Sequence, residues 1–267
     1  MSAACDTLTV KTCCATLYVQ DWVRFILSDT FHPGGIALTR HLGATLQLTP
    51  NNHLLDIAAG PGTSAIEIAR TFGCRVTAID FSAEQVGRAA AAVRAAGLAD
   101  RVTCVQGDAE CLPFAANSFD AILCECAFCT FPNKRAAGTE CYRVVRAHGR
   151  LAFSDIALDP TTLSPTLRGI LGVVACIADA RPASEYIAIL SAAGFVNFQV
   201  EDHAAALEQI LCQIERRLFT VKVAAALGKL QLGNLDLTKA HPLIAEVRSH
   251  IAAGNATYIT LLASTSY

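Results

Sequence analysis

Short apolar runs alternate with amphipathic stretches along most of the chain. The apolar runs are rich in β-branched residues and are bounded by turn residues, so they predict strands. Longer stretches with apolar residues every three or four positions separate the first five strands and predict helices. Such an alternation indicates a parallel sheet whose two faces are both covered. The seven predicted strands are His53–Ala58, Cys74–Ile79, Val102–Gln106, Ala121–Glu125, Arg150–Ser154, Phe195–Val200 and Tyr258–Ala263.

The predicted helices lie before, between and after these strands. Two amphipathic helices precede the first strand and are joined by the turn His32-Pro33-Gly34-Gly35. Near the C-terminus, Gly194 ends a helix in the manner of a C-cap, and the two strands that follow would pair at one edge of the sheet. The predicted helices are Leu17–Ser28, Ile36–Leu46, Ser64–Phe72, Ala83–Ala96, Lys134–Arg146, the segment from Arg181-Pro182 through Ala193, and Ala204–Leu227.

These elements predict an α/β fold with a doubly wound, mostly parallel seven-stranded sheet, N-terminal helices and C-terminal helical additions. We expect one domain, because no segment resembles a long linker. Within it, residues 1–50 would form a helical lid, residues 51–156 a ligand-binding core, and residues 157–267 the acceptor side and C-terminal elements.

Composition narrows the range of functions. The chain has 267 residues, of which 53% are hydrophobic and 16% charged, and its formal net charge is −2. It therefore offers no basic stripe for nucleic acid and no polybasic membrane anchor. The N-terminus lacks the apolar core of a secretory signal, and the run Ile170–Ala178 is too short to span a bilayer. We expect a cytoplasmic protein with no nucleic-acid or membrane partner.

A glycine-rich turn follows the first strand. Gly60 and Gly62 allow the backbone to bend tightly and to approach a ligand closely. The next strand ends at Asp80, about 20 residues on, where a carboxylate can bind ribose hydroxyls. The third strand ends before Asp108. Because these strand ends meet at one edge of a parallel sheet, the acids should line a single crevice.

These motifs resemble those of the class I S-adenosylmethionine-dependent methyltransferases over roughly residues 34–155. LLDIAAGPGTS is similar to their first motif, AIDFS to their second and GDAECLPF to their third. The resemblance implies a Rossmann-like fold, S-adenosylmethionine as cofactor, Gly60 and Gly62 at its methionine part, Asp80 at its ribose, and Asp108 with Ala109 at its adenine. An alanine, Ala58, stands where the family often has another glycine. The turn lacks the third glycine of an NAD-binding loop, which argues against NAD as the ligand. The residues expected to bind the cofactor are Asp56, Ala58, Gly60, Gly62, Asp80, Phe81, Asp108, Ala109 and Glu125.

A narrower resemblance concerns the methyl acceptor. The stretches Glu125-Cys126-Ala127, ECYRVVRAHGRLAFSDI and ACIADARPASEYIAILSAAGF are similar to segments of the arsenite methyltransferases. By this resemblance Cys126 and Cys176 would be catalytic thiols that hold the metalloid. Cys13 and Cys14 are candidates for a further thiol, although neither aligns securely. Glu125 departs from the family, which usually has Asn there.

The chemistry of arsenic agrees with such a site. Trivalent arsenic is soft and is held by thiolates, and its lone pair can accept a methyl group without a general base. A nearby sulfonium charge would also favour the thiolate form of a cysteine. The leading hypothesis is therefore methyl transfer to a soft, thiol-bound acceptor, with arsenite the best guess. The resemblance implies thioredoxin or glutathione as the thiol reductant for turnover.

Other interpretations remain open. The same type of enzyme could act on a small thiol, a selenium or tellurium compound, or an organic metabolite, with the cysteines only packed in the core. The chain could also be a non-catalytic thiol module that binds a metalloid. Most of the 12 cysteines would then be small buried hydrophobes, as we expect for Cys74, Cys104 and Cys124.

Histidines offer further candidates. His32, His148 and His203 could act as bases for an oxygen acceptor, but other roles are expected. His148 lies in the turn before the fifth strand, where a solvated loop histidine is typical, and His32 opens the Pro-Gly-Gly turn and could be a cap or a lid residue over the cofactor. No pair of Cys or His motifs has the spacing of a zinc site. The Cys126-x-x-Cys129 pair stands alone, so we expect no metal ion, although Cys129 could contribute a thiol.

Overall fold

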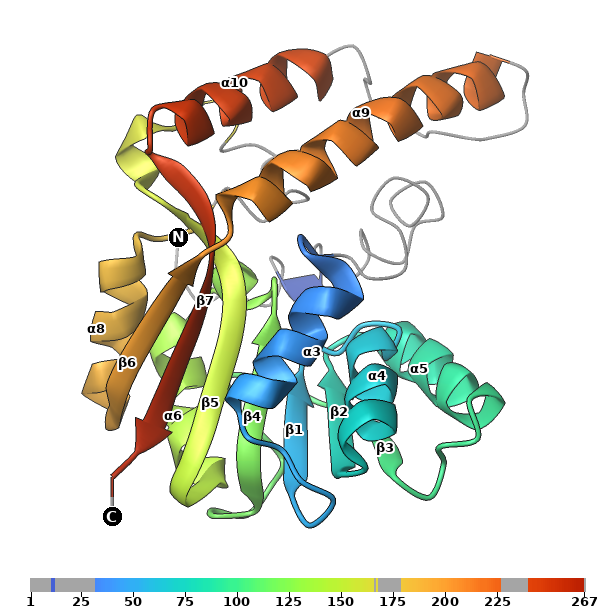
Figure 1. The fold of residues 1–267 in the computed structure, drawn as a ribbon, viewed down its shortest axis with the longest axis vertical. Helices are drawn as coiled ribbons and strands as arrows, with labels where there is room; N and C mark the ends of the chain where they lie inside the picture. Colours follow the sequence, from blue (N-terminus) through green and yellow to red (C-terminus); the bar gives the residue numbers. More distant parts are fainter. Residues whose placement is uncertain (1–10, 13–31, 166, 168–178, 227–239, 267) are drawn as a thin grey trace, which may run out of the picture.

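A computed structural model of the chain describes residues 11–12, 32–165, 167, 179–226 and 240–266. Within these residues, seven strands form one sheet in the order β3-β2-β1-β4-β5-β7-β6 (Figure 1). The strands β1 to β5 are mutually parallel, and β7 runs antiparallel between β5 and β6. The strands are β1 (His53–Ile57), β2 (Arg75–Asp80), β3 (Val102–Gln106), β4 (Phe119–Glu125), β5 (Val145–Leu158), β6 (Phe195–Asp202) and β7 (Ala256–Thr265).

Helices cover both faces of this sheet. On one face α3, α4 and α5 pack against one another, and on the other face α6 packs against α8. The long helix α9 packs on β7 and α10, at the end of the sheet drawn uppermost in Figure 1. The α-helices are α3 (Gly35–Thr45), α4 (Thr63–Phe72), α5 (Ala83–Ala95), α6 (Lys134–Val144), α8 (Ala183–Ala193), α9 (Ala204–Ala226) and α10 (Ala240–Ala252), and the short 3-10 helices are η1 (Phe128–Thr130) and η2 (Pro160–Thr162).

The central strands are buried on both faces. Leu54 and Leu55 are adjacent in β1, and both have no exposed surface. Ile122 and Leu123 are equally buried in the neighbouring strand β4. Since neighbouring residues of a strand point to opposite faces, consecutive burial requires helices on both sides. The doubly wound α/β fold with a mostly parallel seven-stranded sheet, predicted from the sequence, is confirmed.

Several element boundaries differ from the prediction, most of all where α6 meets β5. Helix α6 ends at Val144 instead of Arg146, and β5 begins at once and is longer than expected. The register of β4 and β5 shifts between Phe119 and Ala121, and His148 has a positive φ of 60°. The exposed and irregular start explains why the apolar pattern did not reveal the first residues of β5, whereas its last residues, Asp155–Leu158, are buried and were also missed.

Two other helices do not appear both in the prediction and in the described part of the structure. Helix α10 was not predicted, and Pro242 lies in its first turn, where proline is tolerated. The predicted helix Leu17–Ser28 lies outside the described residues.

Several cysteines are packed in the core, as expected. Cys74 and Cys124 are 0% and 2% exposed, and Cys104 is half-buried against the same core. Burial raises the pKa of Cys74 to about 11 and that of Cys141, on α6, to about 12. These thiols are therefore neutral and inert at physiological pH.

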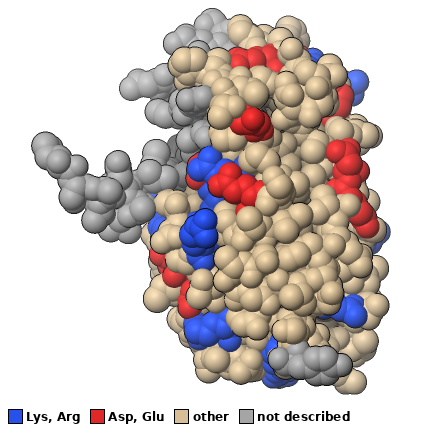
Figure 2. Space-filling view, turned by 90° about the vertical axis from the view of Figure 1, so that its left-hand side faces the viewer, with Lys and Arg blue, Asp and Glu red and all other residues tan. Residues whose placement is uncertain are grey.

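The surface carries charges of both signs. On the face shown in Figure 2, acidic and basic side chains lie in small separate groups among uncharged residues. In the part of the chain that the structure describes, no helix has the length and apolar character needed to cross a membrane.

The burial of Cys74 leads to a stability prediction. Cys74→Ser places a hydroxyl in an apolar site and should lower the free energy of unfolding by about 1–3 kcal/mol. Thermal or urea unfolding measures this change. The exposed Cys111 provides the control, because Cys111→Ser should alter stability little. Equal stability of the two variants would contradict the assignment of Cys74 to the core.

Candidate active site

A cleft opens where the strand order reverses between β1 and β4. Its volume is about 180 Å³, and it is lined by the carboxyl ends of β1, β2 and β4 and by the loops that follow them. This is the position at which open parallel sheets bind ligands, because the connections from adjacent strands leave in opposite directions.

The glycine-rich turn forms one wall of the cleft. Gly60 has a φ of 54°, and a Cβ atom added to it would meet no other atom within 4 Å. Gly62 begins α4 with a φ of 83°, and its added Cβ would lie 3.0 Å from the Cβ of Ala89 on α5. Gly60 therefore leaves space for a ligand, whereas Gly62 allows the helix to pack closely behind the turn.

Two non-glycine residues at the cleft adopt the left-handed conformation. Ala58, after β1, has a φ of 57°, and Cys126, after β4, has a φ of 53°. Ala58 stands where the resemblance noted above often has a glycine. The structure shows a cost at this position, which is backbone strain of about 1–2 kcal/mol for a residue with a Cβ atom.

Asp80 joins the turn to the second strand. One carboxylate oxygen accepts a hydrogen bond from the amide of Gly60 at 2.9 Å, and the other accepts one from the amide of Ser82 at 2.8 Å. Burial raises the pKa of Asp80, although both hydrogen bonds act to lower it. Each oxygen keeps a second lone pair that can accept a hydroxyl proton from a ligand.

The far end of the cleft carries an ion-pair cluster. The ammonium group of Lys11 lies 2.7 Å from a carboxylate oxygen of Asp108 and 2.5 Å from one of Glu110. Burial lowers the pKa of Lys11, but the hydrogen bonds to both acids more than offset this and raise it overall. Lys11 therefore stays charged and holds part of the N-terminal segment against the cleft.

A buried carboxyl group lies at the base of the cleft. Asp56 is 2% exposed, and its Oδ2 atom has no hydrogen-bond partner among the described residues. The pKa of Asp56 is raised well above its ordinary value, first by burial and then by the negative charges of Glu125 and Asp80. A cationic ligand in the cleft would counteract this repulsion.

Glu125 is held by hydroxyl groups at the end of β4. Its side chain is 4% exposed, and its Oε2 accepts hydrogen bonds from Ser64 at 2.6 Å and from Thr39 at 3.0 Å. The Nε2 atom of His32 lies 3.7 Å from the Oε1 atom of Glu125. His32, itself 4% exposed, also lines the cleft.

The structure describes only some of the thiols that were predicted to hold an acceptor. Cys126 lines the cleft, and its amide donates to the carbonyl of Ser154 at 2.7 Å. Cys129 is 1% exposed and does not line the cleft, so the core explains its position better than an acceptor site does. Cys13, Cys14 and Cys176 lie outside the described residues.

Most residues predicted to bind the cofactor meet in this cleft. Gly62 is the exception, because it lies behind the turn. Sequence reasoning did not connect His32 with Thr39 and Ser64, since only the fold brings them to Glu125. The residues that line the cleft as predicted are Asp56, Ala58, Gly60, Asp80, Phe81, Asp108, Ala109 and Glu125.

Comparison with known proteins also points to a methyltransferase. A family model described as a methyltransferase domain matches residues 55–153. The O-methyltransferase resE of Aspergillus sclerotiorum is 32% identical over 149 residues, which are 56% of this chain and 56% of that protein. The chain thus spans just over half the length of this curated relative.

Solved structures share the fold at low identity. Phosphoethanolamine N-methyltransferase 2 of Haemonchus contortus, solved in complex with S-adenosyl-L-methionine, has a TM-score of 0.79 at 19% identity over 97% of this chain and 60% of that one. The cyclase SpnF has a TM-score of 0.77 at 21% identity over 94% of both chains. At these identities the likeness establishes the fold alone.

Residues 55–153 therefore match a methyltransferase domain, in a chain that has the fold of the class I methyltransferases, and these matches support S-adenosylmethionine as the cofactor. The residues of the cleft suit that molecule. Its sulfonium and ammonium charges match the carboxylates of Asp56 and Glu125, and its ribose hydroxyls match Asp80. The open space beside Gly60 leaves room for the part of S-adenosylmethionine that would lie against the backbone of the turn.

Gly60 provides a test of the cleft that separates binding from stability. Gly60→Ala would place a methyl group in the ligand space and should weaken S-adenosylmethionine binding roughly tenfold or more. Calorimetric titration measures the affinity.

The matched control is Gly97→Ala. Gly97 also has a positive φ, of 68°, and equally open surroundings, but it does not line the cleft. Both variants should lose similar stability through backbone strain, and only Gly60→Ala should lose affinity. Equal affinity of the two variants would remove Gly60 from the ligand site.

Proposed function

We propose that the chain transfers a methyl group from S-adenosylmethionine to a hydroxyl or amine group of a small organic molecule. The observation that carries this proposal is the approach of His32 to Glu125 in the cleft, with 3.7 Å between Nε2 and Oε1.

The hydrogen bonds of His32 define which of its nitrogens is basic. Its Nδ1 atom lies 3.1 Å from the carbonyl oxygen of Pro33, which can only accept, so Nδ1 carries the proton. Nε2 of the neutral ring is then an acceptor. The hydroxyl proton of Thr39 is already directed to Glu125, and the Thr39 oxygen is 3.5 Å from Nε2.

In this neutral form the lone pair of Nε2 and the carboxylate of Glu125 are two acceptors 3.7 Å apart, and a proton donor beside both would bridge them. Once Nε2 takes up a proton, it can donate to the Thr39 oxygen or pair with Glu125. A hydroxyl or amine group is such a bridging donor, and a thiol-bound metalloid is not. The pair thus selects an acceptor that carries an O–H or N–H group.

The same pair can manage the proton that the reaction releases. S-adenosylmethionine, when bound, supplies an electrophilic methyl group. The acceptor's lone pair forms the new bond to this methyl, the old carbon–sulfur bond breaks, and its electrons remain on sulfur. His32 Nε2 takes the proton from the acceptor, and the Glu125 carboxylate stabilises the resulting imidazolium.

The named relatives lend support to this class of acceptor. The relative from Aspergillus sclerotiorum is described as an O-methyltransferase, and the Haemonchus contortus protein as an N-methyltransferase. Both descriptions belong to those proteins, and the acceptor of this chain is our proposal.

A second candidate is the soft, thiol-bound acceptor, with arsenite as its best example. The position of Cys126 beside Glu125 in the cleft favours it. This reaction needs at least one further thiol from Cys176, Cys13 or Cys14, and a reductant such as thioredoxin or glutathione for turnover. A small selenium or tellurium compound would use the same chemistry.

An acceptor panel with labelled cofactor distinguishes these proposals. The panel contains small hydroxylated and amine compounds, a small thiol and arsenite. We expect transfer to a hydroxyl or amine compound. His32→Gln should then lower kcat by about 10²–10⁴-fold, as for loss of a general base, with S-adenosylmethionine affinity unchanged.

Two further variants complete the test. His241→Gln changes an exposed histidine on α10 and should keep full activity. Cys126→Ser should leave most of the transfer to an organic acceptor intact. If arsenite alone is methylated, and Cys126→Ser abolishes that activity while His32→Gln does not, the thiol-bound acceptor replaces our first proposal.

A further inference from the structure

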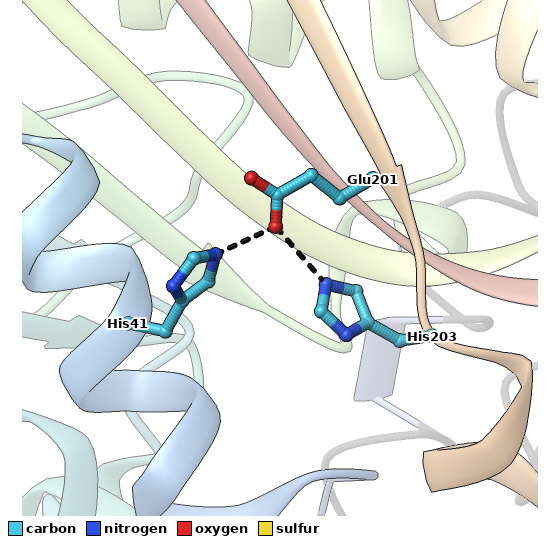
Figure 3. Close-up of side chains that lie close together, drawn as sticks. All are labelled: His41, Glu201 and His203. Atoms are coloured by element: carbon cyan, nitrogen blue, oxygen red, sulfur yellow. Dashed lines mark hydrogen bonds and ion pairs between the residues drawn. The ribbon is translucent and has the colours of Figure 1, made fainter.

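Three side chains from distant parts of the sequence meet on the surface, and none of them lines the cleft. They are His41 on α3, Glu201 on β6 and His203, which directly follows β6 (Figure 3). Figure 3 shows both imidazole rings directed at one carboxylate oxygen of Glu201. One ligand atom from each of the three lies within 4.8 Å of the other two.

The distances within this group are short. His41 Nε2 lies 2.6 Å from Glu201 Oε2, and His203 Nε2 lies 3.5 Å from the same oxygen. The two rings meet edge to face, with centroids 6.1 Å apart. His203 Nε2 has one other polar neighbour, the hydroxyl of Thr260 at 3.3 Å.

The backbone fixes the positions of these residues. Glu201 and His203 are two residues apart along an extended segment, so their side chains lie on the same side of the sheet. Glu201 pairs with Thr260 in β7, and the amide of His203 donates to the carbonyl of Tyr258 at 2.7 Å. His41 lies in the middle of α3, so only side-chain rotations are needed to adjust the group.

We propose that His41, Glu201 and His203 bind a divalent transition-metal ion, with Zn²⁺ the best match. Two imidazoles and one carboxylate are a ligand set that zinc accepts, with bonds of roughly 2.0–2.2 Å. In a tetrahedral site such bonds place ligand atoms about 3.3 Å apart, close to the separations that the three residues already have. Harder cations such as Mg²⁺ prefer oxygen ligands and would bind less well.

The exposure of the group completes the coordination. The side chains of His41 and Glu201 are 45% and 49% exposed, so a water molecule can occupy the fourth position. The ion would replace the hydrogen bond between His41 and Glu201, and the ring that gives up Nε2 to the ion would carry its proton on Nδ1.

Such an ion would connect two separate parts of the fold. It would tie α3 to the edge strand β6. Thr39 on the same helix donates to Glu125 in the cleft, two residues before His41. The ion would hold the helix that carries this contact, and its role would be structural.

No motif in the sequence indicated this site. Zinc motifs are recognised by ligands a few residues apart, whereas His41 and Glu201 are 160 positions apart. We expected no metal ion for that reason.

Metal titration of the full chain, stripped of metal with a chelator, tests the proposal. Co²⁺ is the optical probe, because its visible absorption reports four-coordinate geometry and thiolate ligands add a separate band in the near ultraviolet. Wild type should bind one Co²⁺ without the thiolate band, and Zn²⁺ should displace it. His41→Ala and His203→Ala should each weaken binding roughly tenfold or more.

The control is His241→Ala, which removes an exposed histidine on α10 and should bind Co²⁺ as wild type does. Zn²⁺ should also raise the melting temperature of wild type and His241→Ala, but not of Glu201→Gln, which keeps the side chain's size. Equal Co²⁺ affinity in wild type, His41→Ala and His203→Ala would overturn the proposal and leave a hydrogen-bonded group. A thiolate band in the wild-type spectrum would overturn it too.

Discussion

Three carboxylates buried at the ends of neighbouring strands dominate this structure. Asp56, Asp80 and Glu125 end β1, β2 and β4 or lie near those ends, and the sheet order brings all three to one cleft. Like charges in a buried site repel one another, and the raised pKa of Asp56 records this repulsion together with its burial. Backbone amides stabilise Asp80, and hydroxyl groups stabilise Glu125. A cationic cofactor would supply the positive charge that offsets the repulsion among these three carboxylates.

Residues around the cleft also keep these carboxylates in place and leave room for a ligand beside them. The turn at Gly60 leaves space beside Asp80, and Ala58 and Cys126 accept strained backbone conformations where the strands end. Strain of this kind persists only where the rest of the structure holds it in place. Helix α3 contributes through Thr39, which donates to Glu125, so an element outside the sheet also helps to shape the acceptor side.

The sequence was most informative where structure is local. Apolar runs located the strands, and the glycine-rich turn with Asp80 located the cofactor side, because each depends on residues close in the chain. The contact of His32 with Glu125 and the group around Glu201 depend on tertiary packing over many residues, and no spacing rule predicts them. For the cysteines, the sequence suggested a function that the burial of most of the described thiols does not support. Their number suggested a thiol site, yet Cys74, Cys124 and Cys129 are buried, and among the described thiols only Cys126 lines the cleft.

The claim that the cleft is built for a cation is tested most directly by comparing two ligands that differ in one charge. S-adenosylmethionine carries a sulfonium, and S-adenosylhomocysteine carries a neutral thioether. Their affinities are measured by calorimetry over a pH series that starts at the ordinary pKa of an aspartate, about 4, and rises from there. Because burial raises the pKa of Asp56, this group ionises at a higher pH than an ordinary aspartate does. The account predicts that the preference for S-adenosylmethionine over S-adenosylhomocysteine increases with pH. A preference that stays constant over the range would contradict it.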